Sequence, residues 1–177
     1  MKKKRRRLFV MVMSFLILLG IVMIYNTHRK KEAIKQTIRT IQKFSLKQTT
    51  GDLFTQDSFT GANWKVFIFF HSECGFCQED AQQLSAIKDS IKNTLFLWIS
   101  SESFTQIKTF AEQYQLTEDH TVLFFQDQQG RLSDSWGIRS TPQFLVYNPQ
   151  GELVKNHQGA WRMNHLMEQI NHEFQVH

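Results

Sequence analysis

The feature that most constrains this chain is a pair of cysteines two residues apart, the only cysteines among its 177 residues. They stand in the motif Cys-Gly-Phe-Cys at residues 74–77, shortly after the apolar run 64–70. A run of this length predicts a buried strand, and the motif then falls at the start of a helix of about 75–91. At a helix N-terminus the free N–H groups and the helix dipole favour a thiolate, the form that attacks disulfides. The motif therefore predicts redox chemistry at Cys74 and Cys77.

Two structural uses of the pair compete with this interpretation. A structural disulfide across so short a loop constrains the unfolded chain little, so it would stabilise the fold poorly. A four-ligand zinc site needs two more ligands, and the chain has no second cysteine pair. Redox chemistry is the interpretation that we favour.

Charge divides the chain into two parts. Residues 1–50 carry thirteen Lys and Arg against one acid, a net charge of +12, whereas residues 51–177 carry a net charge of −7. The overall charge of +5 therefore belongs to the N-terminal segment. An acidic domain repels a phosphate backbone, so we exclude nucleic acid as a partner.

The N-terminal segment has the pattern of a membrane anchor. Lys and Arg fill positions 2–7, and residues 8–25 contain no charged side chain. As a helix this run would extend about 27 Å, close to a hydrocarbon core of about 30 Å. The run is longer than the apolar part of a usual signal peptide, and no small-x-small site follows it. We therefore expect an uncleaved signal anchor over 8–25 rather than a cleaved signal peptide.

The flanking charges predict the orientation of this anchor. Six basic residues precede the run and three follow it at 29–31, so the basic segment 1–7 is expected to stay in the cytoplasm. The rest of the chain then lies in the periplasm or otherwise outside the cytoplasmic membrane. That compartment is oxidising, which suits a working dithiol pair.

Residues 26–43 predict a basic amphipathic stalk or linker helix, because Ile34, Ile38 and Ile41 recur at helical spacing. We expect this helix to lie near acidic lipid head groups or to pack on the domain, and a dimerising role stays open.

Residues 44–177 predict the folded domain. Residues 44–59 form short extended pieces around a turn at 49–52. Beyond the first strand and helix, the apolar patterns predict strands at 94–100, 121–125, 143–147 and 152–157 and helices at about 103–115 and 163–174. Strands and helices alternate first, and a hairpin and a helix close the chain. This order predicts an α/β fold with a mixed sheet and helices on both faces.

A second motif lies downstream, where Pro142 follows Trp-Gly-Ile-Arg-Ser-Thr at 136–141 and opens an apolar strand. With residues 69–77 it resembles the thioredoxin superfamily, whose two signature elements are the C-x-x-C and the Thr-Pro before a strand. Within it the chain most resembles the membrane-anchored bacterial thiol–disulfide oxidoreductases of the TlpA/ResA type. The insertion at about 94–116, the closing hairpin at 147–154 and the anchor carry this likeness, which covers about 44–174.

The resemblance implies a thioredoxin-like fold and a division of roles. Cys74 would be the exposed attacking thiolate, and Cys77, one helical turn deeper, would resolve the mixed disulfide. Pro142 would follow a cis peptide bond and lie beside the disulfide, and the backbone of Thr141 would pair with an extended substrate peptide. The redox-active disulfide would serve without a cofactor or metal, and the substrates would be protein thiols and disulfides.

The chain departs from the family pattern at two positions before the second cysteine. Glu73 stands where a tryptophan is common, and its carboxylate is expected to raise the pKa of Cys74 unless it is a solvated loop acid. Gly75 and Phe76 resemble the Gly-Tyr of periplasmic disulfide isomerases, which leaves the direction of electron flow open.

Two further departures concern acids. Ile68 stands where many thioredoxins carry a buried acid in the strand before the motif. Asp80 stands where TlpA-type proteins often have a glutamate. Asp80 and Glu79 also suit the first turn of a helix, where the dipole favours acids, and this is the interpretation that we favour for both.

The sequence therefore predicts a thiol–disulfide oxidoreductase of cell redox homeostasis, single-pass in the bacterial inner membrane. We expect it to act as a reductase fed by a transmembrane electron donor. The alternatives are a disulfide isomerase or oxidase, a binding module with a structural disulfide, and a copper metallochaperone with Cys74, Cys77 and a histidine such as His71 as ligands. Against copper, thioredoxin-fold copper proteins place a histidine in a later loop, and none occurs between His120 and His157.

Overall fold

The computed structural model describes residues 2–61, 63–117 and 120–176, with the side chains at 2–10, 12, 14 and 173–176 left out. The chain forms two compact units that divide between Thr37 and Ile38. Each unit is described by itself.

The N-terminal unit is one helix, α1 (Lys2–Thr37). It contains the whole of the predicted anchor 8–25, of which the side chains at 8–10, 12 and 14 lie outside the described residues. Among the residues that the structure describes, no helix is both long and apolar enough to cross a membrane. The helix ends at Thr37, and the remaining residues of the predicted stalk, 38–43, belong to the second unit, where Ile38 is buried.

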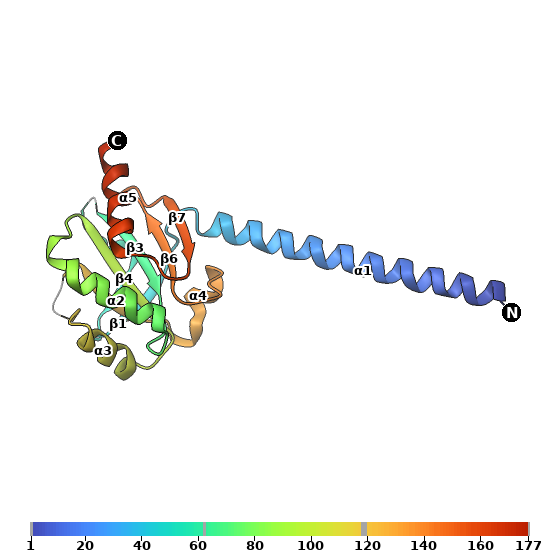
Figure 1. Cartoon of the computed structure of the whole chain (residues 1–177), viewed down its shortest axis with the longest axis horizontal. Helices are drawn as coiled ribbons and strands as arrows, with labels where there is room; N and C mark the ends of the chain where they lie inside the picture. The colour runs from blue at the N-terminus through green and yellow to red at the C-terminus, as the bar shows by residue number, and fades with distance from the viewer. Residues whose placement is uncertain (1, 62, 118–119, 177) are drawn as a thin grey trace. The chain divides into compact units, whose positions relative to one another are not determined.

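Seven strands of the described residues form one mixed sheet in the order β2-β1-β5-β4-β3-β6-β7 (Figure 1). Their bounds are β1 (Ser45–Gln48), β2 (Leu53–Thr55), β3 (Trp64–Phe69), β4 (Thr94–Ser100), β5 (Val122–Gln126), β6 (Gln143–Tyr147) and β7 (Leu153–Gln158). Strand β3 pairs in parallel with β4 and antiparallel with β6, and β6 forms a hairpin with β7. This arrangement confirms the mixed sheet and the closing hairpin that the sequence predicts.

The helices of the second unit are α2 (Gly75–Ile87), α3 (Phe104–Gln113), α4 (Arg131–Ser135) and α5 (Met163–Val176). The described residues also form three short 3₁₀ turns, at Gln56–Ser58, Lys88–Ser90 and Gln128–Gly130. The predicted helix 75–91 is shorter than expected, because the chain tightens into the second of these turns. Helix α4 was not predicted.

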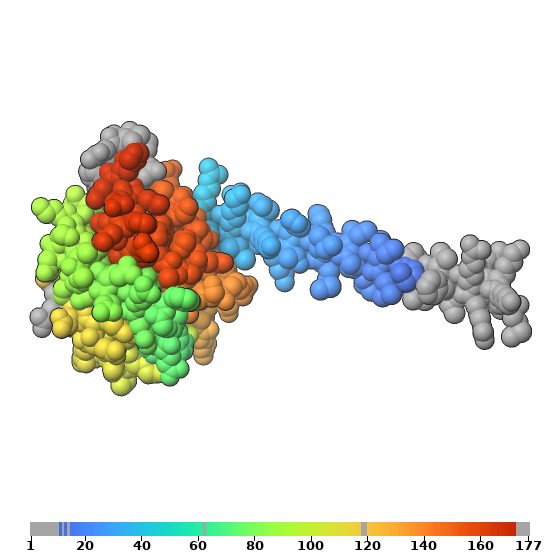
Figure 2. Space-filling view, in the orientation of Figure 1, coloured from blue at the N-terminus to red at the C-terminus, as the bar shows by residue number. Residues whose placement is uncertain are grey.

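Two apolar layers lie on the two faces of the sheet. Along β3 the side chains alternate, so Val66 and Ile68 join one layer while Phe67 and Phe69 join the other. Helices α2, α3 and α5 contribute to the first layer, and α4 with residues 38–46 contributes to the second. Helices α2 and α5 lie side by side (Figures 1 and 2). Helix α2 is therefore packed between the sheet and a second helix.

The core beneath α2 is expected to support the dithiol. Leu84, in the middle of α2, has no exposed surface and belongs to the first apolar layer. We predict that Leu84→Ala lowers the free energy of unfolding by about 2–5 kcal/mol, because it leaves a cavity in a packed core. Urea unfolding of the full chain measures this. The control Leu53→Ala, at a side chain that is 68% exposed, should change it by less than about 0.5 kcal/mol.

Candidate active site

The dithiol lies at the junction of the central strand and its helix. Cys74 is the N-cap residue of α2, in an extended conformation, and its N–H donates to the carbonyl of His71 over 3.0 Å. Its own carbonyl accepts the first helical bond, from the N–H of Gln78 at 3.0 Å. The N–H groups of the first turn have no acceptor within the helix, so the positive end of the helix dipole lies beside the Cys74 sulfur.

The two sulfurs differ in environment. Cys74 is half-buried, whereas Cys77 has no exposed surface, and both are free thiols in this structure. Burial, foremost, raises the pKa of the Cys77 thiol far above its ordinary value, and the Cys74 sulfur and the Asp80 charge act in the same direction. The Cys77 thiol therefore keeps its proton at neutral pH. These positions suit the predicted roles of an exposed attacking sulfur and a buried resolving one.

The second motif is brought to the first. The Thr141–Pro142 peptide bond is cis, as predicted. The Cys74 sulfur lies 3.6 Å from the Thr141 carbonyl oxygen, to which it donates a hydrogen bond. Pro142 is buried, and Thr141 is exposed. An exposed backbone thus borders the nucleophile, and an extended peptide can pair with such a backbone.

Asp80 is placed differently from what we expected. It is not a first-turn acid of α2, and it has no exposed surface. One carboxylate oxygen, Oδ1, accepts a bond from the N–H of Trp161 at 3.3 Å, while Oδ2 has no hydrogen-bond partner among the described residues. Burial, only partly offset by the Trp161 bond, raises the pKa of Asp80 to about 7. The interpretation as a dipole-favoured surface acid is therefore wrong for Asp80, although Glu79 is exposed.

The remaining predicted residues line the surface around Cys74. The Phe76 ring is 60% exposed, and Gly75 and Glu73 are also exposed. The Glu73 N–H donates to the His71 ring at Nδ1 over 3.3 Å. A Cβ at Gly75 would meet nothing within 4 Å, so space does not require glycine there. The modulating roles of these residues stay predictions.

Sequence reasoning missed one acid at this end of the sheet. Glu102 lies two residues after the end of β4 and accepts hydrogen bonds from the N–H and the hydroxyl of Ser72, in the loop before Cys74. The position offered a signal, because β3 and β4 are parallel and the carboxyl ends of parallel strands meet at one edge.

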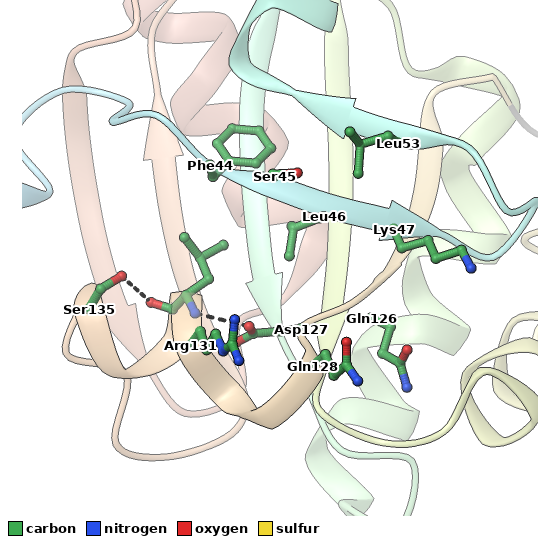
Figure 3. Close-up of a pocket in the computed structure, with 11 residues that line it drawn as sticks. Phe44, Ser45, Leu46, Lys47, Leu53, Gln126, Asp127, Gln128, Arg131 and Ser135 are labelled. Carbon is green, nitrogen blue, oxygen red and sulfur yellow. Dashed lines mark hydrogen bonds between the residues drawn. The ribbon is translucent and has the colours of Figure 1, made fainter.

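A hollow elsewhere on the second unit is not the candidate site. A cavity of about 460 Å³ opens between β1 and the segment around α4, lined by side chains such as Leu46 and Gln128 (Figure 3). Two of its polar side chains bond to the backbone of α4, since Asp127 accepts from the N–H of Leu132 at 2.9 Å and Ser135 donates to the Leu132 carbonyl at 2.9 Å. None of the predicted site residues lines this cavity.

No group of three or more His, Cys, Asp or Glu side chains that could hold a metal ion is found within the described parts of the chain.

The chain belongs to the thioredoxin-like domain family, whose pattern it matches over residues 57–173. No curated protein matches it in sequence. The family supports the predicted class of enzyme, a thiol–disulfide oxidoreductase.

Solved structures with the same fold include several disulfide oxidoreductases. One is a secreted Mycobacterium tuberculosis disulfide oxidoreductase homologous to E. coli DsbE, with a TM-score of 0.59, 22% identity, and coverage of 70% of this chain and 90% of that one. Another is StoA from Bacillus subtilis, with a TM-score of 0.58, 20% identity, and coverage of 73% and 97%. Copper-bound ScoI from Arabidopsis thaliana also shares the fold, with a TM-score of 0.60, 13% identity, and coverage of 77% and 98%. At these identities the likeness extends to the fold alone.

The raised pKa of Asp80 predicts a pH-dependent stability. Folding raises this pKa from an ordinary 3.8 to about 7, so the folded state favours the protonated carboxyl more than the unfolded state does. The contribution of this group to the free energy of unfolding is therefore complete below pH 3.8 and is lost as pH rises through about 7. The loss amounts to as much as about 4 kcal/mol. Asp80→Asn removes the ionisation, so the reduced variant should be more stable than the wild type at pH 8 and differ little at pH 4. Urea unfolding at both values measures this, and equal differences at the two values would contradict it.

Proposed function

We propose that the chain is a membrane-anchored thiol–disulfide oxidoreductase that reduces disulfides of proteins outside the cytoplasmic membrane. The observation that carries the chemistry is the half-buried Cys74 sulfur, 3.6 Å from the Thr141 carbonyl at a helix N-terminus, with Cys77 buried one turn along the helix. The nucleophile, the resolving thiol and a backbone edge for an extended peptide thus lie together.

In the first step the Cys74 thiolate attacks one sulfur of a substrate disulfide. A bond forms between the Cys74 sulfur and that substrate sulfur, the substrate disulfide breaks, and its other sulfur leaves as a thiolate. The helix dipole favours the attacking thiolate, and the exposed backbone at Thr141 holds the substrate segment.

In the second step Cys77 resolves the mixed disulfide. Its thiol must lose a proton, and the buried Asp80, with a pKa of about 7, is an acceptor matched to neutral pH. The Cys77 sulfur then bonds to the Cys74 sulfur, and the second substrate sulfur leaves as a thiolate. The substrate has gained two electrons, and the chain is left with a Cys74–Cys77 disulfide.

The likeness to oxidoreductases of the TlpA/ResA type supports a reductase. Burial keeps the Cys77 thiol protonated until the mixed disulfide forms, as its resolving role requires. A reductase needs its dithiol restored, and we propose a transmembrane dithiol carrier as the electron donor.

The sequence pattern supports the location. Basic residues fill positions 2–7, residues 8–25 carry no charge, and residues 51–177 are acidic overall. This pattern is typical of a signal anchor whose N-terminus stays in the cytoplasm.

Two substitutions test the chemistry. Cys74→Ser should abolish disulfide reduction, because no attacking sulfur remains. Cys77→Ser keeps the attacker and loses the resolving thiol, so it should accumulate mixed disulfides that dithiothreitol releases, seen on non-reducing gels. If both variants reduce insulin at the wild-type rate, the proposed chemistry is wrong.

The direction of electron flow is read from the reduction potential of the Cys74–Cys77 pair, by equilibration with dithiothreitol and glutathione. We expect a value near that of thioredoxin, about −270 mV. A value near about −120 mV would identify an oxidant or isomerase instead.

The location is tested in intact bacterial cells that express the full chain. A thiol reagent that does not cross membranes should label the half-buried Cys74, and the chain should sediment with membranes. A variant without residues 1–25 should be unlabelled until the cells are lysed. Labelling of the full chain only after lysis would place the domain in the cytoplasm.

A further inference from the structure

Glu102 is a buried acid that the exchange steps do not use. Its side chain is 5% exposed. Its carboxylate accepts bonds from the Ser72 N–H at 2.8 Å, the Ser72 hydroxyl at 2.5 Å and the Ser100 hydroxyl at 2.9 Å. The amide of Gln106 and the ring of His71 also reach it, each at 3.5 Å.

These donors keep the group charged. Burial alone would raise the pKa of the Glu102 carboxyl, but the bonds from Ser72 and Ser100 and the charge of His71 outweigh burial and hold that pKa below its usual value. A carboxylate that accepts several bonds in a water-poor setting forms stronger bonds than a neutral acceptor.

Glu102 is itself held by residues at the ends of β4 and β5, which are neighbours in the sheet. Its carbonyl accepts a bond from the side-chain amide of Gln126, at the end of β5 (Figure 3), over 2.9 Å. Its N–H donates to the hydroxyl of Ser100, the last residue of β4, over 3.3 Å. These bonds hold the backbone of Glu102, and with it the carboxylate, in a fixed position relative to the sheet.

Ser72, the main hydrogen-bond partner of the Glu102 carboxylate, lies two residues before Cys74. Ser72 gives both its N–H and its hydroxyl to Glu102, and its carbonyl accepts a bond from the side-chain amide of Gln78, in the first turns of α2, at 2.8 Å. The N–H of Cys74 in turn donates to the carbonyl of His71. The loop is thus tied to the sheet on one side and to α2 on the other.

We propose that Glu102 is a positioning residue for Cys74: its carboxylate fixes Ser72, and through it the loop that holds the Cys74 sulfur opposite the Thr141 carbonyl. This inference rests on the proposed function and deepens it. A protein disulfide held on the Thr141 backbone meets the sulfur in one direction only. A small alkylating reagent approaches from any open side and needs no such alignment.

The test compares two reactions of the reduced full-length chain: reduction of insulin, measured as kcat/KM, and alkylation of Cys74 by iodoacetamide across pH. We expect Glu102→Ala to lower kcat/KM for insulin by about tenfold or more, because small misplacements of a reacting group are costly. Its limiting alkylation rate at high pH should stay within about twofold of the wild type, because that reaction needs no alignment.

Three further variants complete the set. Glu102→Gln keeps a carbonyl acceptor and should recover most of the insulin activity. Ser72→Ala keeps the backbone bond to Glu102 and should lose less insulin activity than Glu102→Ala. If Glu102→Ala does not fold, Ser72→Ala is the variant that tests the proposal. Glu112→Gln removes an exposed carboxylate from α3 and should match the wild type.

Amide hydrogen exchange measures how firmly the loop before Cys74 is held, independently of enzymatic activity. The Ser72 amide should exchange about tenfold faster or more in Glu102→Ala, because its acceptor is gone. Unchanged exchange there, wild-type insulin kinetics, or an equal loss in both reactions overturns the positioning role. A wild-type chain that fails to reduce insulin contradicts the proposed function instead, and the exchange result then still decides the role of Glu102.

Discussion

The antiparallel pairing of β3 with β6 is the constraint on which the site depends. It sets Phe69 opposite Gln143, so the dithiol loop leaves one strand where Pro142 enters the other. Both strands are buried throughout, and a slip of one residue would turn every core side chain to the wrong face. Core packing therefore determines the register, and the register brings the Cys74 sulfur to the Thr141 carbonyl.

The buried acids Asp80 and Glu102 behave in opposite ways. Asp80 receives one N–H bond, so burial dominates and its pKa rises to about 7. Glu102 receives bonds from Ser72 and Ser100, so its pKa falls despite burial. The number of donors thus decides which carboxyl can exchange a proton near neutral pH and which stays charged as a hydrogen-bond anchor.

The strands and helices that the sequence predicted well are long and have a clear apolar pattern. The buried runs of β3 and β4 and the helical spacing in α2 and α5 were predicted close to their final bounds, because hydrophobic periodicity reports burial directly. Helix α4 was missed because five residues are too short to show a period, and its N–H groups at Leu132 and Ser133 bond to the Asp127 carboxylate just before it rather than in a pattern that the sequence shows. The position of Asp80 was misjudged because a helical pattern does not tell which segment packs opposite it.

The sequence by itself determined the reacting groups: two thiols one helical turn apart after a buried strand, and a Thr-Pro step before another. Local spacing suffices for this, because neighbours in sequence must be neighbours in space. Only the tertiary structure decided what surrounds those thiols. Burial raises the pKa of Asp80 despite its bond from Trp161, and bonds from Ser72 help to lower the pKa of Glu102. Trp161 and Ser72 lie far from these acids in sequence and meet them only when the sheet and its helices pack.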